Sequence, residues 1–394
     1  MSSNKFLLYI CIASTLSMIN NSMVSSPLLK NFIYGLMVLF EFKLFLHCKF
    51  YNFGGYNIGR IVIPMLFIFM SFLHSNYEPL WGLYIKYIGY ILCFIYGSLS
   101  WNSGSSIKIN KVLLYFTIFT PLILVGLFDK TPHKTVFYTL SNVYSFAGLC
   151  FSFYYYTVFY YNKNVFIKSL FLVAIFIISS STLGILFAFV LSIAYISRRN
   201  TKMAFSFVLI FLLILLLVQY SDIQVFQRVK DVVAVFSNMS KEDWRNISEL
   251  NMWEISKDVD YSSDRTDNTS AIWRLSHWAK LLQDFLKYWY YSLIIGLGDC
   301  YTLAVLGNVP HNDYLRFLCE YGLIVFSYII YYIRQLLRAL KNDEALIFIV
   351  AFLFYSLSEN LINTFASNCL LYFCIGYHYE RCKQGNIKSI MYFI

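Results

Sequence analysis

Residues 310–316 read PHNDYLR and lead directly into an apolar run, so a long polar segment enters a membrane helix here. Asn and Asp are favoured N-cap residues, and either Asn312 or Asp313 is therefore expected to begin the helix. His311 then lies at the positive end of the helix dipole, where the neutral imidazole is favoured over the imidazolium. Two interpretations follow: a histidine base held at the membrane surface, or a capped membrane helix with an interfacial histidine.

Hydrophobic residues make up 59% of the 394 residues, aromatic residues 20% and charged residues 13%. This composition is typical of integral membrane proteins, because a core this apolar would not stay soluble. Apolar runs recur along the chain and predict an all-α, polytopic membrane helix bundle of about 12 transmembrane helices. The runs are Phe6–Ile19, Leu28–Leu46, Ile61–Leu73, Leu80–Leu99, Val112–Phe128, Val143–Tyr161, Val165–Ile178, Leu183–Ile196, Ala204–Tyr220, Tyr314–Ile333, Ala345–Leu357 and Thr364–Tyr377.

The Lys and Arg residues gather in alternate short loops, and this asymmetry predicts the orientation. It places both termini in the cytoplasm. It also divides the chain into membrane spans within residues 1–220, a large loop on the outer side of the membrane at residues 221–313, and the last spans within residues 314–394. The net charge of +10 is then mostly a topology signal, and nucleic acid is not expected as a partner.

The long loop is predicted to be mostly helical. Apolar residues recur at helical spacing over residues 223–236, as expected of a helix on the membrane surface or on the bundle. A second helix is predicted over residues 271–289, with Arg274, Trp278, Leu281 and Phe285 on one face. The polar residues 238–270 between these helices are interpreted either as a mobile flap or as a flexible connection without a role of its own.

The residues that bind metals and nucleotides are not arranged in recognisable motifs. The six histidines are scattered, so no metal site is predicted. A phosphate-binding loop with its lysine is absent, and residues 296–298 are interpreted as a turn. No cofactor is expected. The nine cysteines lie mostly in or beside apolar segments and do not imply a disulfide framework.

Basic side chains at the outer membrane face are what a lipid-linked phosphate would require. Arg274 is the first candidate, and its alternative is an interfacial arginine that snorkels among aromatic residues. Arg265 and Arg316 are weaker candidates, since Arg316 could equally pair with Glu320. Lys86 lies inside an apolar span, where it either serves a function or snorkels to the surface.

These segments together resemble the O-antigen polymerase and O-antigen ligase superfamily. The resemblance lies in residues 269–285, in residues 295–298 (IGLG), in His311 to Leu315, and in residues 320–323 (EYGL). It covers about fifty residues, and the late outer loop and the many apolar runs agree with it. One feature departs from the family pattern: residues 179–183 read SSSTL, where many members carry an arginine.

The resemblance implies a metal-independent, inverting glycosyl transfer at the outer face of the bacterial inner membrane. It implies that His311 is the base and that Arg274 holds the pyrophosphate of an undecaprenyl-pyrophosphate-linked oligosaccharide. Arg265, Arg316, Asn312, Lys86 and Trp278 are the predicted substrate-binding residues. Two alternatives follow from the missing arginine: Arg265, Arg316 or Lys86 makes the second pyrophosphate contact, or the span that begins at residues 179–183 is assigned wrongly. Membrane lipid, a chain-length regulator and a flippase are the expected partners.

The preferred interpretation is a polysaccharide polymerase that moves a growing glycan from one lipid carrier to another lipid-linked repeat unit. One alternative is the ligase of the same superfamily, which delivers the glycan to lipid A-core. An alternative from another class is a lipid-linked oligosaccharide flippase. The sequence disfavours a flippase, because it has no visible internal repeat and no pair of spans broken by Gly or Pro.

Overall fold

The structure is a computed structural model of the chain. It describes residues 27–48, 59–77, 81–102, 240–248, 268–307, 309–341, 346–357, 360–363 and 365–391, together with Phe6, Tyr9 and Asp343. Several predictions concern other parts of the chain. The runs between residues 112 and 220, the turn at residues 179–183, the helix at residues 223–236 and Arg265 all lie outside the described residues.

The described residues are helical, and no strand occurs among them. Five of the apolar runs are confirmed as helices: α2 (Pro27–Cys48), α3 (Gly59–His74), α4 (Trp81–Asn102), α16 (Asp313–Ala339) and α18 (Phe365–Met391). A sixth run forms the shorter α17 (Leu346–Tyr355), which is followed by the 3₁₀ turn η2 (Leu361–Asn363).

Two of these helices are long and apolar enough to cross a membrane: Gly82–Trp101 of α4, and α16. The apolar part of α3, Val62–His74, is shorter. These helices are consistent with a membrane protein. The larger bundle of about twelve spans stays a prediction.

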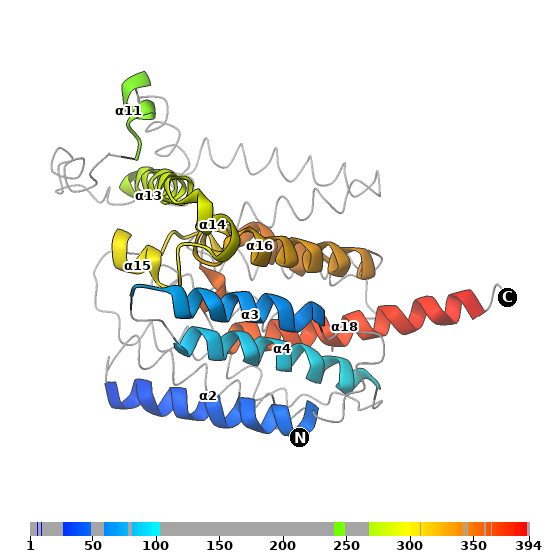
Figure 1. The fold of residues 1–394 in the computed structure, drawn as a ribbon. Coiled ribbons are helices and arrows are strands. Elements are labelled where there is room, and N and C mark those ends of the chain that lie inside the picture. Colours follow the sequence, from blue (N-terminus) through cyan, green and yellow to red (C-terminus); the bar gives the residue numbers. More distant parts are fainter. Residues whose placement is uncertain are drawn as a thin grey trace, which may run out of the picture.

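Helix α4 packs on both α2 and α18, while α3 packs on α16 (Figure 1). The contact between α4 and α18 is close because each helix has a glycine there. A Cβ atom at Gly97 would overlap the carbonyl oxygen of Phe373, and one at Gly376 would overlap that of Phe94. Small residues allow membrane helices to approach in this way. Aromatic rings fill the adjacent core, where Phe6 lies 4.6 Å from Phe373 between ring centroids.

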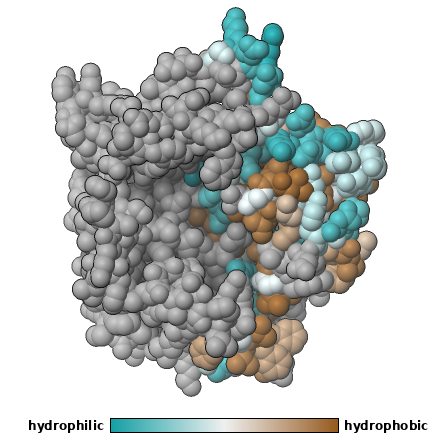
Figure 2. All heavy atoms as spheres, turned by 90° about the vertical axis from the view of Figure 1, so that its left-hand side faces the viewer, coloured by the Kyte–Doolittle hydropathy of each residue, from teal (hydrophilic) through white to brown (hydrophobic). Residues whose placement is uncertain are grey.

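Helices α13 (Asn268–Lys287), α14 (Trp289–Ile295) and α15 (Tyr301–Leu306) lie at the end of the bundle where α3 ends and α16 begins (Figure 1). The short α11 (Lys241–Arg245) lies beyond α13. Figure 2 views this end of the molecule and shows hydrophilic residues gathered in its upper part, with hydrophobic residues below them. The predicted second helix of the loop is thus confirmed, although it divides into α13 and α14.

Helix α16 is broken at Gly322, which has φ 84° and ψ 174°. The break lies where the end of α14 crosses α16. A Cβ atom at Gly296 would overlap the carbonyl oxygen of Glu320, and one at Gly322 would lie 2.5 Å from the carbonyl oxygen of Ile294. Both glycines have positive φ, so each meets a conformational and a steric requirement at once. At this crossing the N–H groups of Leu297 and Gly298 donate to the carbonyl oxygens of Cys319 and Glu320 on α16.

Candidate functional site

The turn that joins α15 to α16 carries His311. The side-chain oxygen of Asn312 accepts a hydrogen bond from the Leu315 N–H at 3.0 Å, so Asn312 is the N-cap of α16. His311 precedes the cap and has φ 47°, a left-handed conformation that is uncommon for residues other than glycine. The sequence prediction that a cap places His311 at the helix N-terminus is confirmed, and Asn312 is the capping residue.

Asp313, the first residue of α16, fixes the other side of this turn. Its N–H donates to the carbonyl oxygen of Ser356 at 2.9 Å, and its carboxylate accepts from the Ile362 N–H at 3.1 Å. Both partners belong to the segment that follows α17. The start of α16 is therefore held by backbone groups from a distant part of the chain.

Helix α13 packs one face against α16 and the residues that follow α14, and its Trp278 reaches the turn. Leu281 and Phe285 are buried beside Leu297 and Cys319. In the middle of the helix, the indole N–H of Trp278 donates a hydrogen bond to the carbonyl oxygen of Pro310, the residue before His311. The prediction that Trp278, Leu281 and Phe285 share an inward face is confirmed.

Trp273 makes a second contact between α13 and the turn. Its ring lies edge-on to the His311 ring, with 5.4 Å between centroids. On the other side it lies 4.5 Å from the ring of His277, one helical turn further along α13. Arg274 is half-buried and directly follows Trp273 in the chain. The structure thus brings the start of α13, with Arg274, to the turn that carries His311.

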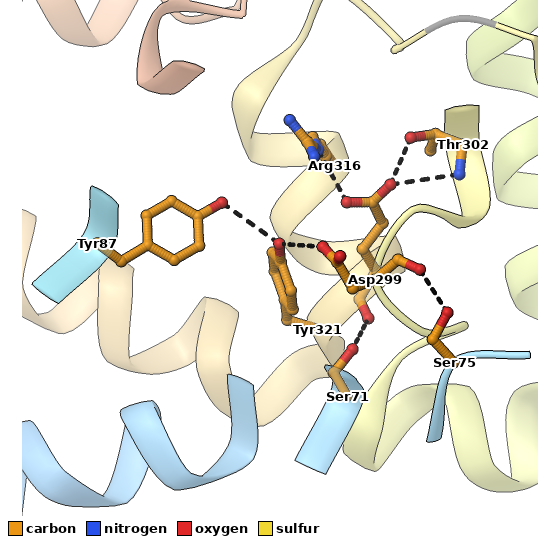
Figure 3. Close-up of polar contacts among 8 residues, drawn as sticks. Ser71, Ser75, Tyr87, Asp299, Thr302, Arg316 and Tyr321 are labelled. Atoms are coloured by element: carbon orange, nitrogen blue, oxygen red, sulfur yellow. Dashed lines mark hydrogen bonds and ion pairs between the residues drawn. The ribbon is translucent and has the colours of Figure 1, made fainter. Parts of the chain in front are cut away.

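Arg316 lies one turn into α16 and is 1% exposed. Its Nε donates to a carboxylate oxygen of Glu320 at 2.8 Å, and the two side chains form a buried ion pair (Figure 3). Of the two alternatives that the sequence left open for Arg316, the structure shows the pair with Glu320. The other oxygen of Glu320 accepts from the N–H of Thr302 at 3.2 Å and from the Thr302 hydroxyl.

Asp299 anchors the chain between α14 and α15, and it is fully buried. Its carboxylate accepts from the Tyr321 hydroxyl at 2.9 Å, and its carbonyl oxygen accepts from the Ser75 hydroxyl at 2.6 Å (Figure 3). The Tyr321 hydroxyl in turn lies 3.3 Å from that of Tyr87 on α4. These hydrogen bonds therefore join the segment before α15 to α16, to α4 and to the residue that follows α3.

Tyr301 fixes α15 to α13. Its hydroxyl donates to a carboxylate oxygen of Asp284 at 3.0 Å. Burial raises the pKa of Tyr301 above its usual range, and the neighbouring charge of Asp284 raises it further. The hydroxyl therefore remains a donor at neutral pH.

Two further cations, Lys86 and Arg265, are predicted from the sequence to bind substrate. Lys86 is half-buried on α4, and the hydroxyl of the next residue, Tyr87, lies 3.3 Å from that of Tyr321. Arg265 lies outside the described residues. Among the described residues, no group of three or more His, Cys, Asp and Glu side chains could hold a metal ion.

Sequence reasoning did not single out Trp273, Asp299 or Thr302. Trp273 carries a readable signal, because it shares a helical face with His277 and stands next to Arg274. Asp299 and Thr302 carry no such signal, since their partners Tyr321 and Glu320 lie in another helix.

The chain matches no protein-family model and no curated protein. A functional assignment therefore depends on the residues of the His311 turn and of α13, and on the chemistry that they can perform.

Proposed function

We propose that this chain is a membrane glycosyltransferase of the O-antigen polymerase type. It transfers a growing glycan from undecaprenyl pyrophosphate to the non-reducing end of another lipid-linked repeat unit, without a metal. The observation that carries this proposal is the contact of two residues of α13, Trp273 and Trp278, with the turn that presents His311. Arg274 follows Trp273 directly on the same helix. A base and a guanidinium at one end of a membrane helix bundle suit a substrate that combines a sugar with a lipid-borne phosphate.

His311 is the general base in this proposal. A sugar hydroxyl is a poor nucleophile at neutral pH, and a neutral imidazole can remove its proton as it attacks. The hydroxyl oxygen forms a bond to the anomeric carbon while the bond from that carbon to the pyrophosphate oxygen breaks. Attack from the face opposite the leaving group inverts the anomeric centre.

Arg274 stabilises the leaving pyrophosphate. Negative charge develops on the departing oxygen, and a guanidinium can hydrogen-bond to it in a bidentate manner. Stabilisation of this charge replaces the acid that a glycosidase carboxylate would supply, so a carboxylate pair is not required. The half-buried position of Arg274 strengthens this interaction, because the local dielectric is lower than in bulk water.

Trp273 provides an apolar surface next to the base. Its ring touches both His311 and His277. The C–H face of a sugar ring can pack against such an indole, and orientation of the acceptor hydroxyl toward a base supplies much of the rate of a two-substrate reaction. We assign the acceptor sugar to this surface and the pyrophosphate to Arg274.

The proposal places the protein in the bacterial inner membrane as a multi-pass protein, with both termini in the cytoplasm and His311 facing the periplasm. Its substrates are undecaprenyl-pyrophosphate-linked oligosaccharides. Membrane lipid surrounds it, and a flippase that supplies the substrate and a chain-length regulator are the expected partners.

Deletion of the gene in the native bacterium, followed by a gel of surface lipopolysaccharide, tests the proposal. A core that carries a single repeat unit supports a polymerase. Naked core with polymer retained on the carrier would indicate the ligase. Failure to present any carrier-linked glycan outside the cell would indicate the flippase.

A further inference from the structure

The turn that carries His311 is set by the two helices that it joins. It follows α15 and precedes α16, and His311 itself has φ 47°. A residue other than glycine in this region carries backbone strain, which the surrounding structure must hold. Contacts that hold α15 against α16 therefore support the backbone of His311, together with the hydrogen bond from Trp278 and the contacts of Asp313.

Glu320 makes that connection. Its carboxylate accepts from Arg316 on α16 and from both the N–H and the hydroxyl of Thr302 on α15 (Figure 3). Its carbonyl oxygen accepts from the Ser71 hydroxyl at 2.6 Å and from the Gly298 N–H at 3.2 Å. One residue thus joins α16 to α15, to α3 and to the chain before α15.

The ion pair between Arg316 and Glu320 is fully enclosed. The two side chains are 2% and 0% exposed, and Thr302 is also buried. Burying two charges costs several kcal/mol each, and the mutual attraction only offsets this cost. A neutral pair of similar shape is often equally stable, whereas the loss of one partner leaves an uncompensated charge. The pair is therefore better explained by the geometry that it imposes than by net stability.

We infer that Glu320 is a positioning residue for His311. Through Thr302 it holds α15 against α16, and Arg316 serves as its counter-ion. This inference rests on the proposed function, in which His311 is the base. It assigns Arg316 to the support of the site and leaves the pyrophosphate to Arg274. The competing assignment is that Arg316 leaves Glu320 and binds the phosphate of the substrate.

A charge-neutral double variant separates the two assignments. Glu320→Gln keeps an acceptor for Thr302 but removes the carboxylate that pairs with Arg316, and Arg316→Met removes the cation that pairs with Glu320. The double variant R316M/E320Q removes both charges and retains the contact with Thr302. The assay uses full-length protein in membranes and the undecaprenyl-pyrophosphate-linked oligosaccharide extracted from cells that lack this chain.

We expect each single variant to lower kcat about 10-fold to 100-fold with little change in KM, because small misplacements of a reacting group have effects of this size. The double variant is expected to regain most of the lost rate. Thr302→Val, which removes only the hydroxyl, should lower kcat to a smaller extent. If the double variant is as inactive as Arg316→Met while Glu320→Gln stays active, Arg316 acts on the substrate and the inference is overturned.

Chemical modification of His311 gives a readout that does not depend on glycosyl transfer. Diethyl pyrocarbonate reacts with accessible neutral imidazoles, and peptide mass spectrometry reports each histidine separately. We expect Glu320→Gln and Thr302→Val to raise the modification rate of His311 several-fold, with the exposed His74 on α3 unchanged as the internal control. Unchanged modification of His311 in both variants would refute the positioning role. A wild-type protein without transferase activity would instead refute the proposed function alone.

Discussion

The indole N–H of Trp278 donates its hydrogen bond to the carbonyl oxygen of Pro310, the residue that precedes His311. Trp278 lies on the buried side of α13, one helical turn after Arg274. The bond therefore links the helix that carries the guanidinium to the backbone that carries the imidazole. In this arrangement Trp278 supports the turn, and its indole N–H is occupied by the protein itself.

Replacement of either His311 or Arg274 by alanine should abolish polymer formation. The loss of a general base typically lowers a rate by at least about 100-fold, and the loss of a cation at a leaving group has an effect of similar size. The measurement is the length of the surface glycan on a gel, with membrane insertion checked by immunoblot. Lys280→Ala, an exposed change on α13, is the matched control and should leave the glycan unchanged. Full activity in either alanine variant would remove that residue from the mechanism.

Replacement of Trp273 by alanine should raise KM for the lipid-linked acceptor about fivefold, because an aromatic packing contact contributes roughly 1 kcal/mol. Trp273→Phe keeps a ring and should retain most of the affinity. Trp289 on α14 is 59% exposed, and Trp289→Ala serves as the control for loss of an interfacial tryptophan. Equal KM values for Trp273→Ala and wild type would exclude the acceptor from this surface.

Alanine at the helix crossing should destabilise the protein. At Gly296 and Gly322 the added Cβ meets backbone atoms of the other segment in addition to the strain of positive φ, so a loss of about 3 kcal/mol is expected. Gly307 also has positive φ, but a Cβ there meets nothing within 4 Å, and its alanine variant should lose only about 1 kcal/mol. Thermal unfolding in detergent measures the three variants. Equal losses would show that the crossing is not tightly packed.

The thiol of Cys382 should react slowly with maleimide. It lies on α18 beyond the predicted span, and it donates to the carboxylate of Asp343, which also binds Arg381 and lies 3.3 Å from His378. Burial raises the pKa of Cys382 to about 12, and the charge of Asp343 is the next cause. Because only the thiolate reacts, the rate between pH 7 and pH 9 should rise about tenfold per pH unit without a plateau.

Asp343→Asn removes the charge that opposes ionisation of this thiol, so labelling at pH 8 should become several-fold faster. Peptide mass spectrometry separates Cys382 from the other cysteines, and denatured protein provides the maximum rate. An unchanged labelling rate in Asp343→Asn would show that burial, and not the charge of Asp343, sets the reactivity of the Cys382 thiol.

Features that depend on neighbours in the chain can be predicted from this sequence. The cap at Asn312 and the inward face of α13 both arise within one or two helical turns, and the structure confirms them. The bounds of α2, α3 and α4 follow from apolar length to within three residues, as does the start of α18, but α18 continues to Met391, well beyond the predicted end at Tyr377.

Features that depend on distant contacts cannot be predicted in this way. The break at Gly322 lies where the end of α14 crosses α16. A glycine inside an apolar run does not by itself predict such a crossing. Thr302 and Asp299 find partners 18 and 22 residues away, through side chains that could equally face water. The i,i+4 spacing predicts that Arg316 can pair with Glu320. Only the structure shows that both side chains are buried, which favours this pair over a phosphate as the partner of Arg316.

Elongation by the purified protein tests the central claim most directly. The full chain is reconstituted in liposomes with a radiolabelled undecaprenyl-pyrophosphate-linked repeat unit, in buffer that contains a metal chelator, and the glycan length is followed on a gel. We predict longer lipid-linked glycans with the wild-type protein and none with His311→Ala. A wild-type protein that leaves the repeat unit unchanged, or a His311→Ala variant that elongates it at the wild-type rate, would contradict the account.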